Sequence, residues 1–169
     1  ADRLRATKED LGVAGRLIDL LPHLGNIAGE EPFETSIEDL CRVAGIPLEE
    51  DAAPLPRLLL RRLATLDALR ALVWCLRPHD PGGASPRPYA EVLPEGLSLR
   101  IEAPGSWEGS PERLFHLPRG EEWTERLFLA RASVEADGGR LLLEVREGHL
   151  VALLSWPVPT PSGEAGAQA

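Results

Sequence analysis

The side chains best suited to chemistry are dispersed along this sequence rather than gathered in a motif. The four histidines are far apart and follow no spacing typical of a Ser-His-Asp triad. The two cysteines, Cys41 and Cys75, lie in separate apolar stretches without a CxxC pair, so we expect two buried thiols and no metal site. The sequence also lacks the GxxxxGKS/T phosphate loop and the GxSxG nucleophile motif.

Charge and hydropathy argue against two classes of binding partner, nucleic acids and membranes. Asp and Glu number 27 against 18 Lys and Arg, which gives a formal net charge of −9. Because nucleic-acid binding depends on clustered Lys and Arg, we expect no nucleic-acid partner. No apolar run reaches the roughly 18 residues that a spanning helix needs. There is also no signal peptide, so we expect a cytoplasmic segment without membrane contact. The absence of methionine, even at position 1, indicates a processed chain or a fragment of a longer protein.

The N-terminal segment could carry self-association. Residues 2–24 predict a helix in which apolar side chains recur at alternating spacings of seven, three and four, as in the seam of a coiled coil or helical bundle. Pro22 and Gly25 weaken its last turn. The same stripe could instead cover the core of its own domain, and both interpretations stay open. The seam positions are Leu4, Leu11, Ala14, Ile18 and Leu21.

The segment that follows is predicted to be mostly helical. Ser36 and Asp39 resemble a capping box at the start of a helix that runs to about residue 44. Residues 45–48 predict a short strand. Two prolines then precede the most apolar helix of the sequence, at about residues 55–76, whose wide leucine-rich face indicates burial against a sheet.

The second half combines hairpins with one helix. The pairs Glu95-Gly96 and Glu147-Gly148 each separate two β-like runs, as in a hairpin. The expected elements are strands at 88–93 and 97–103, a helix at 121–137 ended by two glycines, and strands at 140–145 and 149–156. Helices and antiparallel strands in this order predict an α+β fold, a two-layer α/β sandwich.

The element order and several residue runs resemble the GHKL ATPase family, specifically the C-terminal region of sensor histidine kinases. The run LFLARASVEADGGRL, from Leu127 to Leu141, resembles the family's final helix, LALARxIVEAHGGRL. PERLF, from Pro111 to Phe115, resembles its xxLFxxF segment. The resemblance implies a dimerisation-type helix and link over residues 1–30. It also implies an ATPase-like domain of Bergerat type over 34–157, with a mixed sheet and helices on one face, and a disordered tail over 158–169.

The nucleotide-binding motifs of the family are not matched. Its N-box uses asparagines to hold magnesium against the phosphates, whereas the only asparagine here is Asn26 and the matching helix carries Asp67. Its first glycine box, DxGxG, corresponds to the run Glu102-Ala103-Pro104-Gly105-Ser106, which keeps an acid but not the glycine spacing.

The second glycine box, GxGxG, wraps phosphate with backbone N–H groups that glycine allows to approach closely. The corresponding residues include two glutamates and a tryptophan, and carboxylates repel phosphate. We therefore expect no ATP binding, no cofactor, no metal and no catalytic residue. The degenerate positions are Asp67, Glu102, Gly105, Glu122, Trp123, Thr124, Glu125 and Arg126.

The remaining histidine and aromatic residues add little chemistry. His23 lacks the acid and proline that follow the family's phosphoacceptor histidine, so we interpret it as a surface or helix-end residue. Trp74 and Trp156 are expected in the core. Trp107 and Trp123 either fill the vacated nucleotide pocket or mark a surface for a partner.

The sequence thus predicts a non-catalytic, histidine-kinase-like module for protein interaction in two-component signalling. Its expected partners are a response regulator or a kinase, together with a second copy bound through the N-terminal helix. Two alternatives stay open: a divergent but active histidine kinase or phosphotransferase, and an unrelated protein-binding domain.

Overall fold

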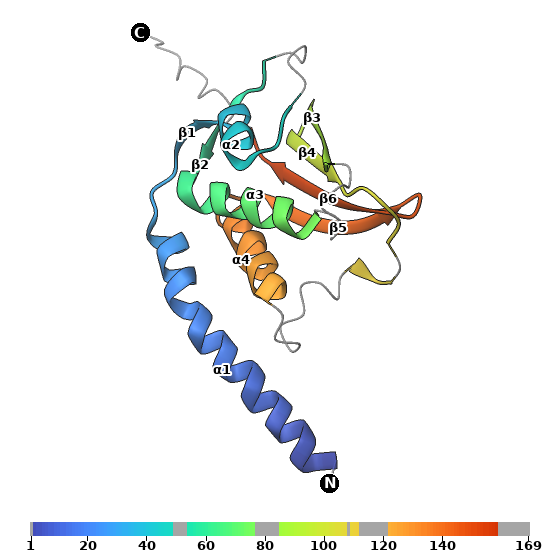
Figure 1. The fold of residues 1–169 in the computed structure, drawn as a ribbon. Coiled ribbons are helices and arrows are strands. Elements are labelled where there is room, and N and C mark those ends of the chain that lie inside the picture. Colours follow the sequence, from blue (N-terminus) through green and yellow to red (C-terminus); the bar gives the residue numbers. More distant parts are fainter. Residues whose placement is uncertain (1, 49–53, 77–84, 108, 112–121, 159–169) are drawn as a thin grey trace.

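The computed structural model describes residues 2–48, 54–76, 85–107, 109–111 and 122–158. A four-stranded sheet forms one layer, and helices that cover one face of it form the other (Figure 1). The N-terminal helix extends away from both layers (Figure 1).

The sheet consists of two antiparallel hairpins joined through their inner strands, in the order β3-β4-β6-β5. Leu99 on β4 lies opposite Leu154 on β6, which lies opposite Leu141 on β5. All three leucines are buried, because side chains of the same period-two register face the helices. The strands are β3 (Arg87–Leu93), β4 (Gly96–Glu102), β5 (Arg140–Arg146) and β6 (His149–Trp156).

The turn between β5 and β6 falls on the predicted pair, whereas the turn between β3 and β4 falls one residue earlier than predicted, on residues 94–95, with Gly96 already in β4. Glu147 and Gly148 have φ angles of 50° and 82°, the two positive values that a type I′ turn needs. At the other turn, a side chain on Gly96 would collide with the carbonyl oxygen of Trp156. Trp156 itself is fully buried, as expected.

A separate two-stranded sheet corrects the long helix expected at residues 55–76. β1 (Phe33–Ser36) pairs antiparallel with β2 (Arg57–Leu60), and only then does α3 (Arg62–Leu76) begin. Alternate residues of β2 are buried and exposed. A strand can bury this short leucine run on one side, and so it takes the period of a strand rather than of a helix.

α2 (Ile37–Ala44) has the expected start and end. Its N-cap hydroxyl, on Ser36, accepts a hydrogen bond from the Asp39 amide at 3.2 Å. Gly45, with a φ angle of 79°, ends the helix in the left-handed conformation. The strand expected at residues 45–48 is not formed, because this segment closes the end of α2 instead.

The N-terminal helix is longer than predicted. α1 (Asp2–Gly29) continues through Pro22, although we expected it to end near residue 24. Pro22 is exposed, so water can reach the carbonyl that its missing N–H leaves without a helical partner. The C-terminal part of α1 contacts α4 (Glu122–Ala136), and Leu20 is buried along this part.

α3 and α4 pack side by side on the sheet and complete the core. α4 can lie this close because Gly139 has no side chain where β5 begins. A Cβ at Gly139 would lie 2.7 Å from Trp156 Cδ1 and 2.9 Å from Val134 Cγ1, and would also meet the Ser155 carbonyl oxygen. The glycine is therefore required by the packing of α4 on β6.

The α+β two-layer class is confirmed. Every strand pairing that the structure describes is antiparallel, so the mixed sheet implied by the resemblance is not found among these residues. The expected tail lies outside the described residues from position 159 onward.

Replacing Gly139 with alanine should lower the free energy of unfolding by about 2 kcal/mol, because the new methyl group must push α4 away from β6. Gly29→Ala is the matched control, since no atom lies within 4 Å of a Cβ there. Urea denaturation followed by circular dichroism measures both. Equal stability of the two variants would contradict the close approach at Gly139.

Candidate functional site: a cavity between three helices

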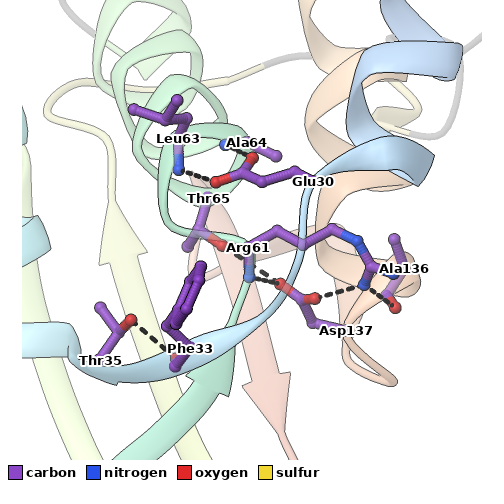
Figure 2. Close-up of polar contacts among 9 residues, drawn as sticks. All are labelled: Glu30, Phe33, Thr35, Arg61, Leu63, Ala64, Thr65, Ala136 and Asp137. Carbon is purple, nitrogen blue, oxygen red and sulfur yellow. Dashed lines mark hydrogen bonds and ion pairs between the residues drawn. The ribbon is translucent and has the colours of Figure 1, made fainter.

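An ion pair joins the start of one core helix to the end of the other. The Asp137 side chain is fully buried, and its Oδ1 lies 2.7 Å from Arg61 Nη1 (Figure 2). The Arg61 backbone amide and the Thr65 hydroxyl both donate to Asp137 Oδ2, at 2.9 and 3.3 Å. Arg61 Nη1 also donates to the Ala136 carbonyl at 2.6 Å. These bonds join the start of α3 to the end of α4.

A second carboxylate joins α1 to α3. Glu30 directly follows α1, and its two oxygens accept hydrogen bonds from the backbone amides of Leu63 and Ala64, at 2.7 and 3.0 Å (Figure 2). The first amides of a helix lack partners within the helix and attract negative charge. Glu30 therefore caps α3 from the adjoining segment.

A cavity of about 600 Å³ lies between α1, α3 and α4. His23 and Asn26 line it from α1, Asp67 and Arg70 from α3, and Arg126 from α4. The remaining lining is mostly small or apolar side chains. Cationic and anionic groups are both present, and one of the anions, Glu30, already caps α3.

Arg126 spans the gap between the two core helices. Its guanidinium carbon lies 4.9 Å from the centre of the Trp74 ring, a cation–π contact between α4 and α3. Trp74 is 47% exposed, so the expectation that it is a core residue was wrong. Its ring is partly exposed and stacks against the Arg126 guanidinium instead of packing into the core.

The two cysteines are thiols of low reactivity, of which Cys41 is buried as expected and Cys75 is only partly buried. Burial raises the pKa of Cys41 to about 12, and the Glu38 carboxylate adds to this effect. Burial also raises the pKa of Cys75 to about 12, against the opposing influence of Arg126. Because the thiolate is the nucleophile and the metal ligand, neither residue is prepared for such chemistry at neutral pH. Among the described residues, no group of three or more His, Cys, Asp or Glu could hold a metal ion.

Comparison with known proteins then identifies the fold. No protein-family model and no curated protein sequence matches the chain. The histidine kinase AdeS of Acinetobacter baumannii superposes with a TM-score of 0.58 at 14% identity, over 93% of this chain and 84% of AdeS. The nucleotide-free catalytic domain of the histidine kinase ThkA gives a TM-score of 0.58 at 18% identity, over 76% of this chain and 96% of that domain.

The chain has the fold of a histidine kinase catalytic domain. Full-length ShkA, solved in complex with AMPPNP, also superposes, with a TM-score of 0.63 at 16% identity. The match covers 95% of this chain and 38% of ShkA, so the chain corresponds to little more than a third of that protein. These likenesses argue against the alternative of an unrelated fold.

Within the histidine kinase fold, the cavity brings together only some of the positions named from the sequence. Asp67 and Arg126 both line it. Thr124 is buried in the first turns of α4, and Glu125 is half-buried. The side chains of Glu122 and Trp123 lie outside the described part of the structure.

Glu102, the acid matched to the first glycine box, does not lie on the helix side of the sheet. Glu102 shares the outward register of Ser98 and Arg100, on the sheet face opposite the helices. The next inward position is Ala103, which is 9% exposed and belongs to the core. Gly105 follows with a φ angle of 89°, and its carbonyl oxygen lies 2.7 Å from His149 Nδ1. The inward direction of Ala103 was not foreseen from the sequence, although the period-two pattern of β4 could have revealed it.

The seam positions of α1 are only partly described. Ala14, Ile18 and Leu21 are exposed, and the side chains of Leu4 and Leu11 lie outside the described part. Leu20 is buried on another side of the helix. No helix of the described part is long and apolar enough to cross a membrane.

Asp137→Asn should lower the free energy of unfolding by about 3 kcal/mol, because it leaves the Arg61 guanidinium without its buried counter-ion. Asp39→Asn is the control. Asp39 also pairs with an arginine, Arg42 at 2.8 Å, but both side chains are mostly exposed, so its loss should change stability by less than about 1 kcal/mol. Denaturant unfolding compares the two, and similar losses would contradict a structural role for the buried pair.

Proposed function

We propose that this chain is a histidine-kinase-like module that neither binds ATP nor transfers its phosphate, and that acts through protein contacts in two-component signalling. One observation carries the proposal. Arg126, which corresponds to the second glycine box, stacks on Trp74 across the gap between α4 and α3. A guanidinium thus occupies a position where close approach of phosphate to backbone would require glycine, and the Trp74 indole of α3 packs against it.

Two other residues, one after β4 and one on α3, also support the absence of ATP binding. Ala103 takes the inward position at the end of β4 and offers no carboxylate to a purine base. Asp67 is exposed and is the only acid that α3 contributes to the cavity. Magnesium prefers octahedral oxygen coordination and is usually held by carboxylates together with substrate phosphates. Asp67 shares the cavity with Arg70 and Arg126. The other carboxylate of the lining, Glu30, is already bonded to the start of α3, so the cavity is a poor start for such a site.

The module would then act by binding other proteins. We propose a response regulator or a kinase as partner, acting in the cytoplasm, and a homodimer formed through α1. The exposed Ile18 and Leu21 support the dimer, because apolar side chains on a helix that extends from its domain gain most from a partner. Burial of Leu20 on another side leaves this stripe available.

One observation favours the competing function, a divergent but active kinase or phosphotransferase. Arg70 and Arg126 both line the cavity, and guanidinium groups bind phosphate in bidentate fashion. A phosphate bound there would lie beside the contact of Arg126 with Trp74.

Calorimetric titration with Mg-ATP and a non-hydrolysable analogue, up to millimolar concentration, should give no saturable heat. Thermal unfolding should also be unchanged, since a ligand that binds only the folded state raises stability. A nucleotide-binding histidine kinase catalytic domain serves as the positive control. Saturable binding that Arg126→Ala weakens would overturn the proposal and support the active alternative.

Ile18→Glu combined with Leu21→Glu should convert a dimer into a monomer in sedimentation equilibrium, because two buried charges would face each other across the seam. The control pair, Val43→Glu and Leu59→Glu, adds the same charge at exposed apolar positions away from α1 and should leave the dimer intact. A monomeric wild type, or equal dissociation in both pairs, would count against self-association through α1.

A further inference from the structure

The sheet face opposite the helices carries an arginine-rich groove. It has a volume of about 340 Å³ and crosses all four strands. Its floor is apolar, with Leu142 on β5 opposite Leu153 on β6. Its polar rim includes Arg100, Arg140 and Arg146, with Tyr89 at the β3 side. None of these residues belongs to the cavity between the helices.

The charge of this groove is opposite to that of the whole chain. Three arginines line it against one carboxylate, that of Glu91, whereas the complete sequence has a formal net charge of −9. Arg146 forms an ion pair with Glu144 on the same strand, so Arg100 and Arg140 are the cations that the groove offers to a partner. Their excess over Glu91 is a feature of this groove. Such a contrast attracts an anionic partner to one face and repels it from the rest.

The side chains are also arranged for contact with a polypeptide. Arg100 lies opposite Tyr89 in the β3–β4 register, and its guanidinium carbon is 5.1 Å from the centre of the tyrosine ring. Stacking orients the guanidinium and leaves its N–H groups directed to the edges, where carboxylates bind. In register, Arg100, Leu153 and Leu142 form one row across β4, β6 and β5. Arginine and tyrosine beside an apolar patch are the composition of energetically important interface centres.

We propose that this face binds an acidic polypeptide segment, with its Asp or Glu side chains on Arg100 and Arg140 and an apolar side chain over Leu142 and Leu153. The proposal concerns a surface separate from the helix-lined cavity and stands whether or not the chain binds ATP. A polypeptide fits better than a nucleic acid because the floor offers leucines, on which an apolar side chain can pack, rather than a row of aromatic rings on which bases stack.

Fluorescence anisotropy with a labelled peptide of alternating Glu and Leu residues tests the proposal. The peptide should bind saturably at physiological salt, and the affinity should fall as salt rises. A peptide of alternating Lys and Leu residues should not bind. Arg100→Glu combined with Arg140→Glu should weaken binding of the Glu-Leu peptide by about tenfold or more, since repulsive pairs replace attractive ones.

The matched control is Arg42→Glu combined with Arg57→Glu, which changes the net charge equally at exposed positions outside the groove. It should alter the affinity by less than about twofold. Because Arg100 also stacks on Tyr89, Arg140→Glu alone, with folding checked by circular dichroism, provides a second variant. No saturable binding of the Glu-Leu peptide, equal weakening by both double variants, or tighter binding of a single-stranded oligonucleotide would each overturn the proposal.

Discussion

The arrangement of the helical layer depends on one buried carboxylate. Asp137 lies where α4 ends, and it is neutralised by Arg61 and bonded by Thr65 where α3 begins. A buried charge is tolerated only when it is paired and hydrogen-bonded, so these two ends cannot separate without a large loss of stability. The fixed ends set the spacing of the two helices along their length. The contact of Arg126 with Trp74, and with it the width of the cavity, follows from that spacing.

Local signals in the sequence were sufficient for much of the fold. Ser36 and Gly45 mark the two ends of α2 through capping chemistry that involves only neighbouring residues. The turn at Glu147 and Gly148 is specified in the same way, since it needs two positive φ angles and little else. Period-two leucines then orient the hairpins, and these local patterns indicate an α+β fold. The histidine-kinase-like fold was indicated by the resemblance of the run from Leu127 to Leu141 to the family's final helix.

Features that depend on distant contacts could not be predicted. The leucine run of β2 fits a helix or a strand, and its pairing with β1 decides between them. The partner of Arg61 lies 76 residues further along the chain, and no spacing rule connects them. At the candidate site, the resemblance of the run from Glu102 to Ser106 to the first glycine box matched Glu102 to the family's aspartate. The pleat of β4 directs that residue outward and Ala103 inward.

The cap that Glu30 provides makes the junction after α1 more than a linker. A helix joined to a domain by a free segment can swing without affecting it, but here the residue after α1 is bonded to the first amides of α3. Capping interactions of this kind contribute about 1 kcal/mol to the stability of a helix. Rotation of α1 about its axis would therefore pull on α3 until the cap releases. Small movements of the N-terminal helix would thus move the start of α3 with it, whereas larger ones would break the two hydrogen bonds of Glu30 and leave α3 in place.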